Sequence, residues 1–318
     1  METCLAIAGG FVLLIGGGEM LVRGAVSVAR ALKVTPLLIG LTLVGFGTSA
    51  PELVTSVVAA LEGSPGIAAG NIVGSNTANI LLILGLAALV HPLGIDPKGF
   101  RRDALWLMAA SLALLALVLW GDMDRPSGIA LIAAIVVYVV RVARSEPAEP
   151  DVTATARQAR GGKALSQPLR PGLAVLLAGA GIAATILGAR LLVSGAIELA
   201  RLLAVSETVI GLTIVAVGTS LPEMVTSLVA AYRRQADIAY GNIVGSNIYN
   251  ILFILGVTAT VQPIPIPVQI ARLDIWVMVA ATGLLVFFGR SGFSLTRWEG
   301  AAFVATYAAY VWYLATHA

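Results

Sequence analysis

The chain has 318 residues, of which 58% are hydrophobic and only 12% are charged, with a mean hydropathy of +0.93. A soluble domain usually carries about 25% charged residues, so the composition excludes a soluble globular protein and indicates an integral membrane protein. Its one cysteine, Cys4, excludes an internal disulfide and a cysteine-based metal cluster.

Ten apolar stretches, each long enough to cross a hydrocarbon layer of roughly 30 Å, follow one another between short polar breaks. They are predicted to be helices, because the alternation of a membrane β-strand is absent. The expected spans are 4–29, 36–61, 66–90, 104–121, 127–142, 172–199, 206–231, 238–261, 273–289 and 298–316. The first span contains Glu19 and Arg23, which are expected to pair at i,i+4, so it is predicted to be retained rather than cleaved as a signal peptide.

A polar stretch over 143–171, rich in Pro, Ala, Gly and Arg, predicts a linker between two halves, 1–142 and 172–318. Each half holds five spans. Because five is odd, the second half enters the membrane from the opposite side to the first. The predicted fold is therefore an all-α integral membrane protein of ten transmembrane helices in two inverted-topology five-helix repeats, an organisation known from secondary transporters.

Charge predicts the orientation of these spans. When the N-terminus is placed outside, most of the 20 Lys and Arg residues fall in the loops on the linker side. The positive-inside rule then predicts that both termini lie outside and the central loop is cytoplasmic, in the inner membrane of a prokaryotic cell. The basic residues are spread over these loops, which argues against nucleic acid as a partner.

Two motifs occur once in each half. The segment 47–56 (GTSAPELVTS) returns as 218–227 (GTSLPEMVTS) with 8 of 10 positions identical. The segment 70–81 (GNIVGSNTANIL) returns as 241–252 (GNIVGSNIYNIL) with 10 of 12 identical, at the same offset of 171 residues. The polar residues inside these apolar segments have been retained, which indicates that they have a shared task.

Glu52 and Glu223 lie near the middle of the second and seventh spans, where an ionised carboxylate costs several kcal/mol. No Lys or Arg lies in the same span cores, so a bound metal ion is the expected compensation. Hydroxyls stand three and four residues before each glutamate, on the same face of a helix. These residues are Thr48, Ser49, Thr219 and Ser220.

Further oxygen donors are expected beside each carboxylate. Pro51 and Pro222 cannot donate to the carbonyls of Gly47 and Gly218, which leaves backbone oxygens free. The following spans contribute i,i+4 pairs and adjacent amides, namely Ser75, Asn79, Ser246 and Asn250 with Asn76 and Asn247. Carboxylate, hydroxyl, amide and carbonyl oxygens without His or Cys favour hard cations such as Ca²⁺ and Na⁺.

Other polar positions of the motifs have a structural interpretation. Small hydroxyl residues pack helices in membranes, which is the expected role of Thr55, Ser56, Thr226 and Ser227. Asn71 and Asn242 are expected to cap or bridge helices.

The doubled motifs, in this order and in both halves, resemble the alpha-repeats of the sodium/calcium exchangers in the cation/calcium exchanger superfamily, and the resemblance covers nearly the whole chain. It implies an antiporter that exchanges Ca²⁺ for Na⁺ by alternating access, with the first and sixth spans sliding against the rest. It also implies that Glu52 and Glu223 are the central calcium ligands. The other implied ligands are Thr48, Ser49, Ser75, Asn79, Thr219, Ser220, Ser246 and Asn250, with the backbone carbonyls of Gly45 and Ala216.

One position departs from some relatives, which carry an aspartate in one repeat where this chain has Asn79 and Asn250. Only two formal negative charges are therefore certain in the site. They neutralise one Ca²⁺ or two Na⁺, and a third Na⁺ would leave a net positive charge in a low dielectric.

Three other functions are open to a chain with these features. The Gly-x-Ser-Gly form at 289–292 occurs in intramembrane proteases, but no histidine lies in a span core. A passive cation channel could use the same carboxylates, although inverted repeats favour a carrier. Proton/calcium exchange is the main alternative, because a buried glutamate can carry a proton. The expected partners are Ca²⁺, Na⁺ and the lipid bilayer, with no cofactor and no obligatory protein partner.

Overall fold

The computed structural model describes residues 2–31, 49–145 and 170–317, and these are helical apart from short connections and four two-residue strands. The all-α class predicted from the sequence is confirmed for this part of the chain. In the first half the helices are α1 (Glu2–Ala31), α4 (Ala50–Leu61), α5 (Pro65–Ala78), η2 (Asn79–Leu84), α6 (Gly85–Val90), α7 (Pro97–Trp120) and α8 (Arg125–Ser145), where η marks a π-helical segment.

The second half repeats this order. Its helices are α10 (Pro171–Leu203), α11 (Glu207–Ile210), η3 (Gly211–Val215), α12 (Ala216–Thr219), α13 (Leu221–Tyr232), α14 (Ala236–Tyr249), η4 (Asn250–Ile254), α15 (Leu255–Val261), η5 (Ile270–Asp274), α16 (Ile275–Arg290) and α17 (Arg297–His317). Segments that follow one another without a break, such as α5, η2 and α6, form one continuous rod.

Seven helices in the described part are long and apolar enough to cross a membrane, or eight if the bent pair Glu207–Thr219 and Leu221–Tyr232 counts as one span. A multi-pass membrane protein is thereby confirmed. The expected number of ten stays a prediction, because the predicted second span begins at residue 36, outside the described residues, and α17 is not among the seven.

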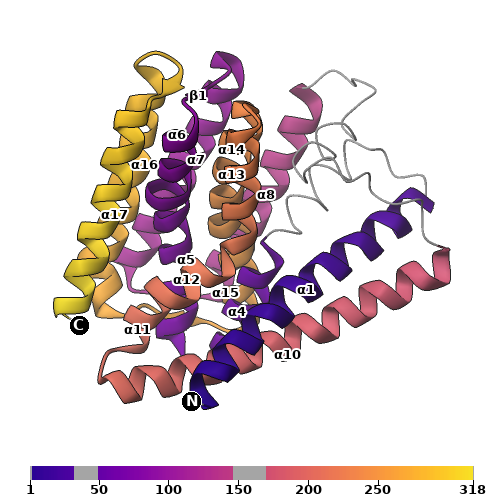
Figure 1. Cartoon of the computed structure of the whole chain (residues 1–318). Coiled ribbons are helices and arrows are strands. Elements are labelled where there is room, and N and C mark those ends of the chain that lie inside the picture. The colour runs from indigo at the N-terminus through magenta and orange to yellow at the C-terminus, as the bar shows by residue number, and fades with distance from the viewer. Residues whose placement is uncertain (1, 32–48, 146–169, 318) are drawn as a thin grey trace.

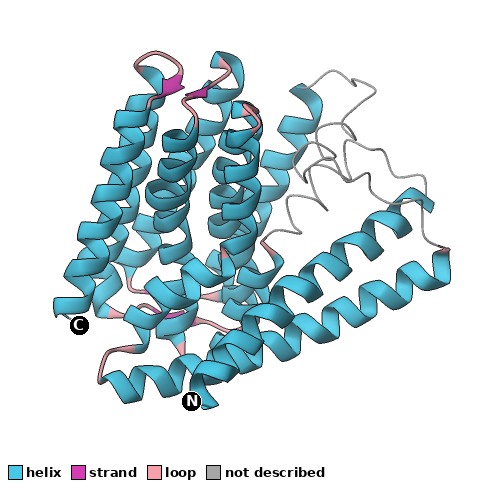
Figure 2. Cartoon of the chain, in the orientation of Figure 1, coloured by secondary structure: helices cyan, strands magenta, loops and turns pink. Residues whose placement is uncertain are grey.

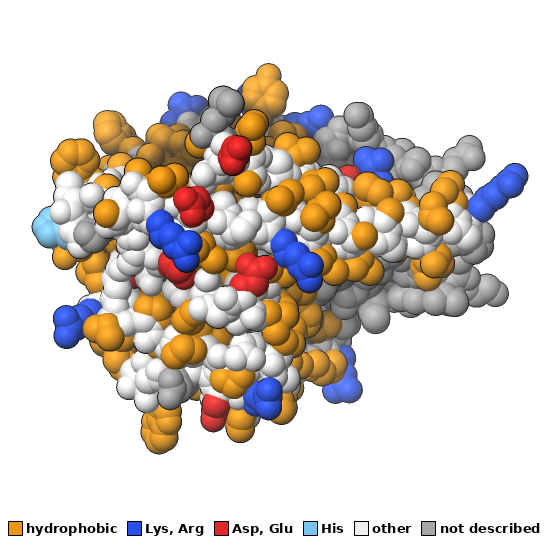
Figure 3. Space-filling model, turned by 90° about the horizontal axis from the view of Figure 1, so that it is seen from below, with side chains coloured by type: hydrophobic (Ala, Val, Ile, Leu, Met, Phe, Trp, Pro, Cys, Tyr) orange, Lys and Arg blue, Asp and Glu red, His pale blue; other side chains and the backbone are white. Residues whose placement is uncertain are grey.

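Large apolar side chains cover the outer surface, as expected for a surface that faces lipid. Val12, Leu105 and Trp120 are 71%, 70% and 88% exposed. Seen from below, the molecule shows hydrophobic side chains over much of its surface, with acidic and basic side chains interspersed toward the middle (Figure 3).

The helices α1 and α10 lie side by side and run obliquely to the remaining bundle (Figure 1). They are antiparallel, and glycines let their backbones touch. A Cβ on Gly10 would lie 2.8 Å from the Leu192 backbone nitrogen, and one on Gly17 would lie 2.8 Å from that of Thr185. Small residues at such seams are how membrane helices approach closely.

Two short antiparallel ribbons join the halves (Figure 2). Strand β1 (Leu93–Gly94) pairs with β4 (Ser294–Leu295), and β2 (Asp122–Met123) pairs with β3 (Ile264–Pro265). Each ribbon takes one strand from each half. The connection after the third predicted span is tied to that after the ninth, and the connection after the fourth is tied to that after the eighth.

The proline break predicted in the seventh span is confirmed. The helix ends at Thr219, restarts at Leu221 with Pro222 in its first turn, and bends by 50°. Pro51 likewise lies in the first turn of α4. Proline is well placed there, because the first-turn N–H groups of a helix have no intrahelical acceptor.

Candidate ion-binding site

Two buried glutamates lie at the start of two short helices. Glu52 is in the first turn of α4 and Glu223 is in the first turn of α13, and each is 1% exposed. A helix N-terminus stabilises negative charge, because its first N–H groups and the helix dipole point toward it. The Glu223 charge also acts on Glu52, so the two carboxylates share one electrostatic environment.

Each glutamate accepts a hydrogen bond from a serine of the other half. The Ser220 hydroxyl donates to Glu52 Oε1 at 2.9 Å, and the Ser49 hydroxyl donates to Glu223 Oε1 at 3.0 Å. The sequence spacing placed each serine beside the glutamate of its own helix, whereas the hydrogen bond that each serine makes is to the glutamate of the other half. Ser49 and Ser220 are the N-caps of their helices, with ψ of 9° and 10° instead of the helical value of about −42°, so regular i,i+3 spacing does not extend to them.

Two asparagines hold the glutamate backbones in place. Asn71 donates to the Glu52 carbonyl at 3.3 Å and to Ser56 Oγ at 2.9 Å. Asn242 makes the equivalent bonds to the Glu223 carbonyl and Ser227 Oγ at the same two distances. The helix-bridging role expected of both asparagines is therefore confirmed.

The bend at α12 brings further oxygens together. The Thr219 hydroxyl donates to Asn71 Oδ1 at 3.1 Å and to the Ala216 carbonyl at 3.3 Å. The Ser75 hydroxyl donates to the same Ala216 carbonyl at 3.4 Å, and the Ser246 hydroxyl donates to Glu223 Oε1 at 3.4 Å. Four predicted ligand positions of α5, α12 and α14 thus gather around the two helix starts.

Two of the predicted ligand positions, Thr48 and Gly45, lie outside the described residues. Their repeat equivalents, Thr219 and Ala216, are 1% and 0% exposed and lie within the cluster.

The two asparagines at position 10 of the second motif differ in their bonding. Asn79 donates to Asn247 Oδ1 at 2.9 Å, and Asn247 donates to the Asn76 carbonyl at 3.3 Å. Asn250 is 1% exposed, and neither polar atom of its side chain has a hydrogen-bond partner within the described ranges.

Other buried oxygens are also left without a donor in the described part of the chain, including Glu52 Oε2 and Asn79 Oδ1. A buried acceptor without a partner costs about 1–3 kcal/mol, and more for a charged one. A cation bound among these oxygens would remove that cost.

The π-helical segments that begin at Asn79 and at Asn250 were not predicted from the sequence. Such segments are rare and occur often at functional sites, since the extra residue per turn redirects side chains and carbonyls. Their only signal was that both start at the same position of a repeated motif.

The donor set contains two carboxylates and neutral oxygens. No group of three or more His, Cys, Asp or Glu that could hold a metal occurs in the described residues. Away from the site, Glu19 and Arg23 form the predicted pair on α1 at 2.6 Å.

Comparison with known proteins identifies the family. The family model described as sodium/calcium exchanger protein matches residues 3–144 and again 173–316. The chain belongs to the sodium/calcium exchanger family. Members of this family are membrane transporters, so the exchanger is not an enzyme, and the intramembrane protease alternative is excluded.

Relatives support this membership over nearly the full length. The exchanger is 32% identical to sodium/calcium exchanger MaX1 of Methanosarcina acetivorans, with 95% of each chain covered. It is 36% identical to inner membrane protein YrbG of Escherichia coli K12, covering 83% of this chain and 81% of the relative. The solved structure of the sodium-calcium exchanger NCX_Mj, soaked with Na⁺ and Ca²⁺, aligns with a TM-score of 0.64 at 30% identity over 97% of both chains.

Proposed function

We propose that this exchanger moves Ca²⁺ across the inner membrane in exchange for Na⁺, with both ions binding between Glu52 and Glu223. The observation that carries the proposal is the reciprocal pair of hydrogen bonds, from Ser220 to Glu52 and from Ser49 to Glu223. These bonds join the two halves at the repeated carboxylates Glu52 and Glu223. The membership of the chain in the sodium/calcium exchanger family supports the choice of ions.

The proposed ligands are oxygens of both halves. The carboxylates carry the charge, and hydroxyl, amide and carbonyl oxygens complete the shell, as hard cations prefer. They are Glu52, Glu223, Thr48, Ser49, Ser75, Asn79, Thr219, Ser220, Ser246 and Asn250, with the carbonyls of Gly45 and Ala216. Because Ca²⁺ and Na⁺ would use the same two carboxylates, binding of one excludes the other, and this exclusion couples their fluxes.

Exchange of this kind requires a site that opens to one side at a time. The proposed framework is a pair of inverted five-helix repeats, 1–142 and 172–318, joined by the linker 143–171. The family model matches each half separately, which supports the repeat. In this account α1 and α10 move together, since their glycine seam holds them against each other, and they slide over the bundle that carries Glu52 and Glu223.

The proposed orientation places both termini outside and the central loop in the cytoplasm. The positive-inside rule supports it, because the linker side carries most of the basic residues.

The experiment that tests the coupling ion uses proteoliposomes of the purified exchanger. An outward Na⁺ gradient is expected to drive ⁴⁵Ca²⁺ uptake, and an outward K⁺ gradient of equal size is the control and is expected to drive none. Uptake driven by a pH gradient alone, in the absence of Na⁺, would show proton/calcium exchange instead. Uptake that persists without any counter-ion gradient and does not saturate would show a channel.

A further inference from the structure

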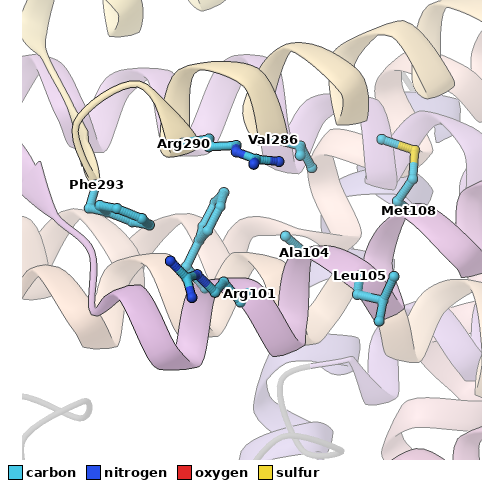
Figure 4. Close-up of a pocket in the computed structure, with 8 residues that line it drawn as sticks. Arg101, Ala104, Leu105, Met108, Val286, Arg290 and Phe293 are labelled. Atoms are coloured by element: carbon cyan, nitrogen blue, oxygen red, sulfur yellow. The ribbon is translucent and has the colours of Figure 1, made fainter.

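A groove of about 590 Å³ lies between α7 and α16, outside the ion site (Figure 4). Two arginines and six apolar residues line it: Phe100, Arg101, Ala104, Leu105, Met108, Val286, Arg290 and Phe293.

The two charges gather at one end of the groove. Arg101 lies in the first turns of α7 and Arg290 is the last residue of α16, and both side chains are exposed. Figure 4 shows them on opposite walls of the groove. Neither arginine forms a salt bridge with an acidic residue of the described chain, so their positive charge is available to a ligand.

The floor of the groove is closed at this charged end. Phe100 is 3% exposed and packs against Gly289, where a Cβ would collide with its ring. The Phe293 ring meets Phe100 edge-on with the ring centres 5.9 Å apart. The two aromatic rings therefore form the floor of the groove at this end.

The charged end also lies at the end of the helices, where the membrane meets water. The ribbon of β1 and β4 joins the segment before α7 to the segment after α16, so both arginines lie next to this ribbon. From there the groove runs past Leu105, Met108 and Val286 toward the middle of the two spans. A molecule that fits it needs an anionic head and an apolar tail.

We propose that this groove binds an anionic phospholipid, with its phosphate between Arg101 and Arg290 and one acyl chain along Leu105, Met108 and Val286. Arginine binds phosphate by charge-assisted, often bidentate hydrogen bonds, and basic pockets between membrane helices hold anionic lipid headgroups. The exchanger thereby recognises a lipid of one leaflet at a site separate from its transported ions.

The pair of charges belongs to one half only. The repeat equivalent of Arg101 is Arg272, but the equivalent of Arg290 is Leu119. A second groove of about 520 Å³ between α7 and α8 has no charged lining residue. The proposed lipid site therefore has no equivalent at the matching positions of the other half. Arg272→Gln is a matched control, because it removes one arginine that does not line the groove.

The test uses the full chain purified in detergent and native mass spectrometry with dioleoylphosphatidylglycerol or dioleoylphosphatidylcholine as the probe. The wild-type protein is expected to retain phosphatidylglycerol preferentially. Each arginine near an anionic lipid contributes about a fivefold gain in binding, so the double variant Arg101→Gln with Arg290→Gln is expected to lose about 25-fold. The variant Arg272→Gln is expected to bind as the wild type does.

Several outcomes would overturn the proposal. They are equal retention of the two lipids by the wild type, an equal loss in Arg272→Gln, and displacement of phosphatidylglycerol by millimolar inorganic phosphate, which would indicate a site for free phosphate. If the double variant does not fold, the single variant Arg290→Gln at the exposed helix end and the wild-type comparison of the two lipids still decide it. The replacements Arg101→Lys and Arg290→Lys are expected to keep part of the preference, since the charge remains.

Discussion

Asn79 and Asn250 occupy the same position of the two repeats but bond differently, so the same substitution is expected to have different results. In Asn79→Asp, a carboxylate oxygen replaces the amide nitrogen that now donates to Asn247 Oδ1 over 2.9 Å. Two acceptors would then face each other in a site where Asn79 is 0% exposed. The lost hydrogen bond and the buried acceptors left without a donor together cost about 3 kcal/mol.

Asn250→Asp loses no bond to a described residue, since neither polar atom of this side chain has a partner there. It adds a third negative charge to the proposed ion site. This charge destabilises the protein without a cation and attracts a cation when one is present. A ligand stabilises the folded state according to its affinity for that state. The rise in unfolding temperature on addition of CaCl₂ is therefore expected to be larger in Asn250→Asp than in the wild type.

The assay is thermal unfolding followed by tryptophan fluorescence in detergent, with CaCl₂ or with a chelator. Asn79→Asp is expected to unfold several degrees below the wild type in both conditions, and Asn250→Asp only in chelator. Identical behaviour of the two variants would contradict the difference in bonding between Asn79 and Asn250.

Two further predictions compare neighbouring positions. A Cβ on Gly17 would lie 2.8 Å from a backbone nitrogen of α10, whereas one on Gly16 meets nothing within 4 Å in the described part. In the same unfolding assay, Gly17→Ala is expected to lower the free energy of unfolding by about 1–3 kcal/mol. Gly16→Ala is expected to leave it unchanged or to raise it. Equal effects would contradict the glycine seam. Tyr310→Phe removes the 2.8 Å hydrogen bond to the fully buried Asp274 and is expected to lower the free energy of unfolding by about 1.5–3 kcal/mol. Tyr307→Phe removes a hydroxyl with no partner among described residues and is expected to change the free energy of unfolding little. A larger loss of stability in Tyr307→Phe than in Tyr310→Phe would argue against the bond from Tyr310 to Asp274.

Much of the fold and of the site could be predicted because the deciding residues are unusual in a membrane. A carboxylate such as Glu52 is rare in an apolar span, and its return as Glu223 marked both copies of one site. Pro222 indicated the break in the seventh span, since a proline cannot continue a regular helix without loss of a backbone hydrogen bond. Both signals are local in the sequence, and the structure bears out the burial and the break.

The contacts between the halves could not be predicted in the same way. Helical spacing assigns Ser49 to the face of Glu52, but the helix begins only after this serine, and its hydroxyl donates to Glu223 174 residues away. The π-helical turns at Asn79 and Asn250 have no known local signal either. Spacing describes one helix, whereas these features depend on which helices meet and at what angle.

In the proposed mechanism Glu52 and Glu223 together hold the transported ion. It is tested most directly by ⁴⁵Ca²⁺ uptake into proteoliposomes under an outward Na⁺ gradient, with Glu52→Gln, Glu223→Gln and the control Glu62→Gln. Glu62 is the exposed residue at the other end of α4, so its replacement changes the same chemical group outside the site. We expect uptake to be lost in both site variants, which keep their fold, and to be unchanged in Glu62→Gln. Uptake at the wild-type rate by Glu52→Gln or Glu223→Gln would contradict it.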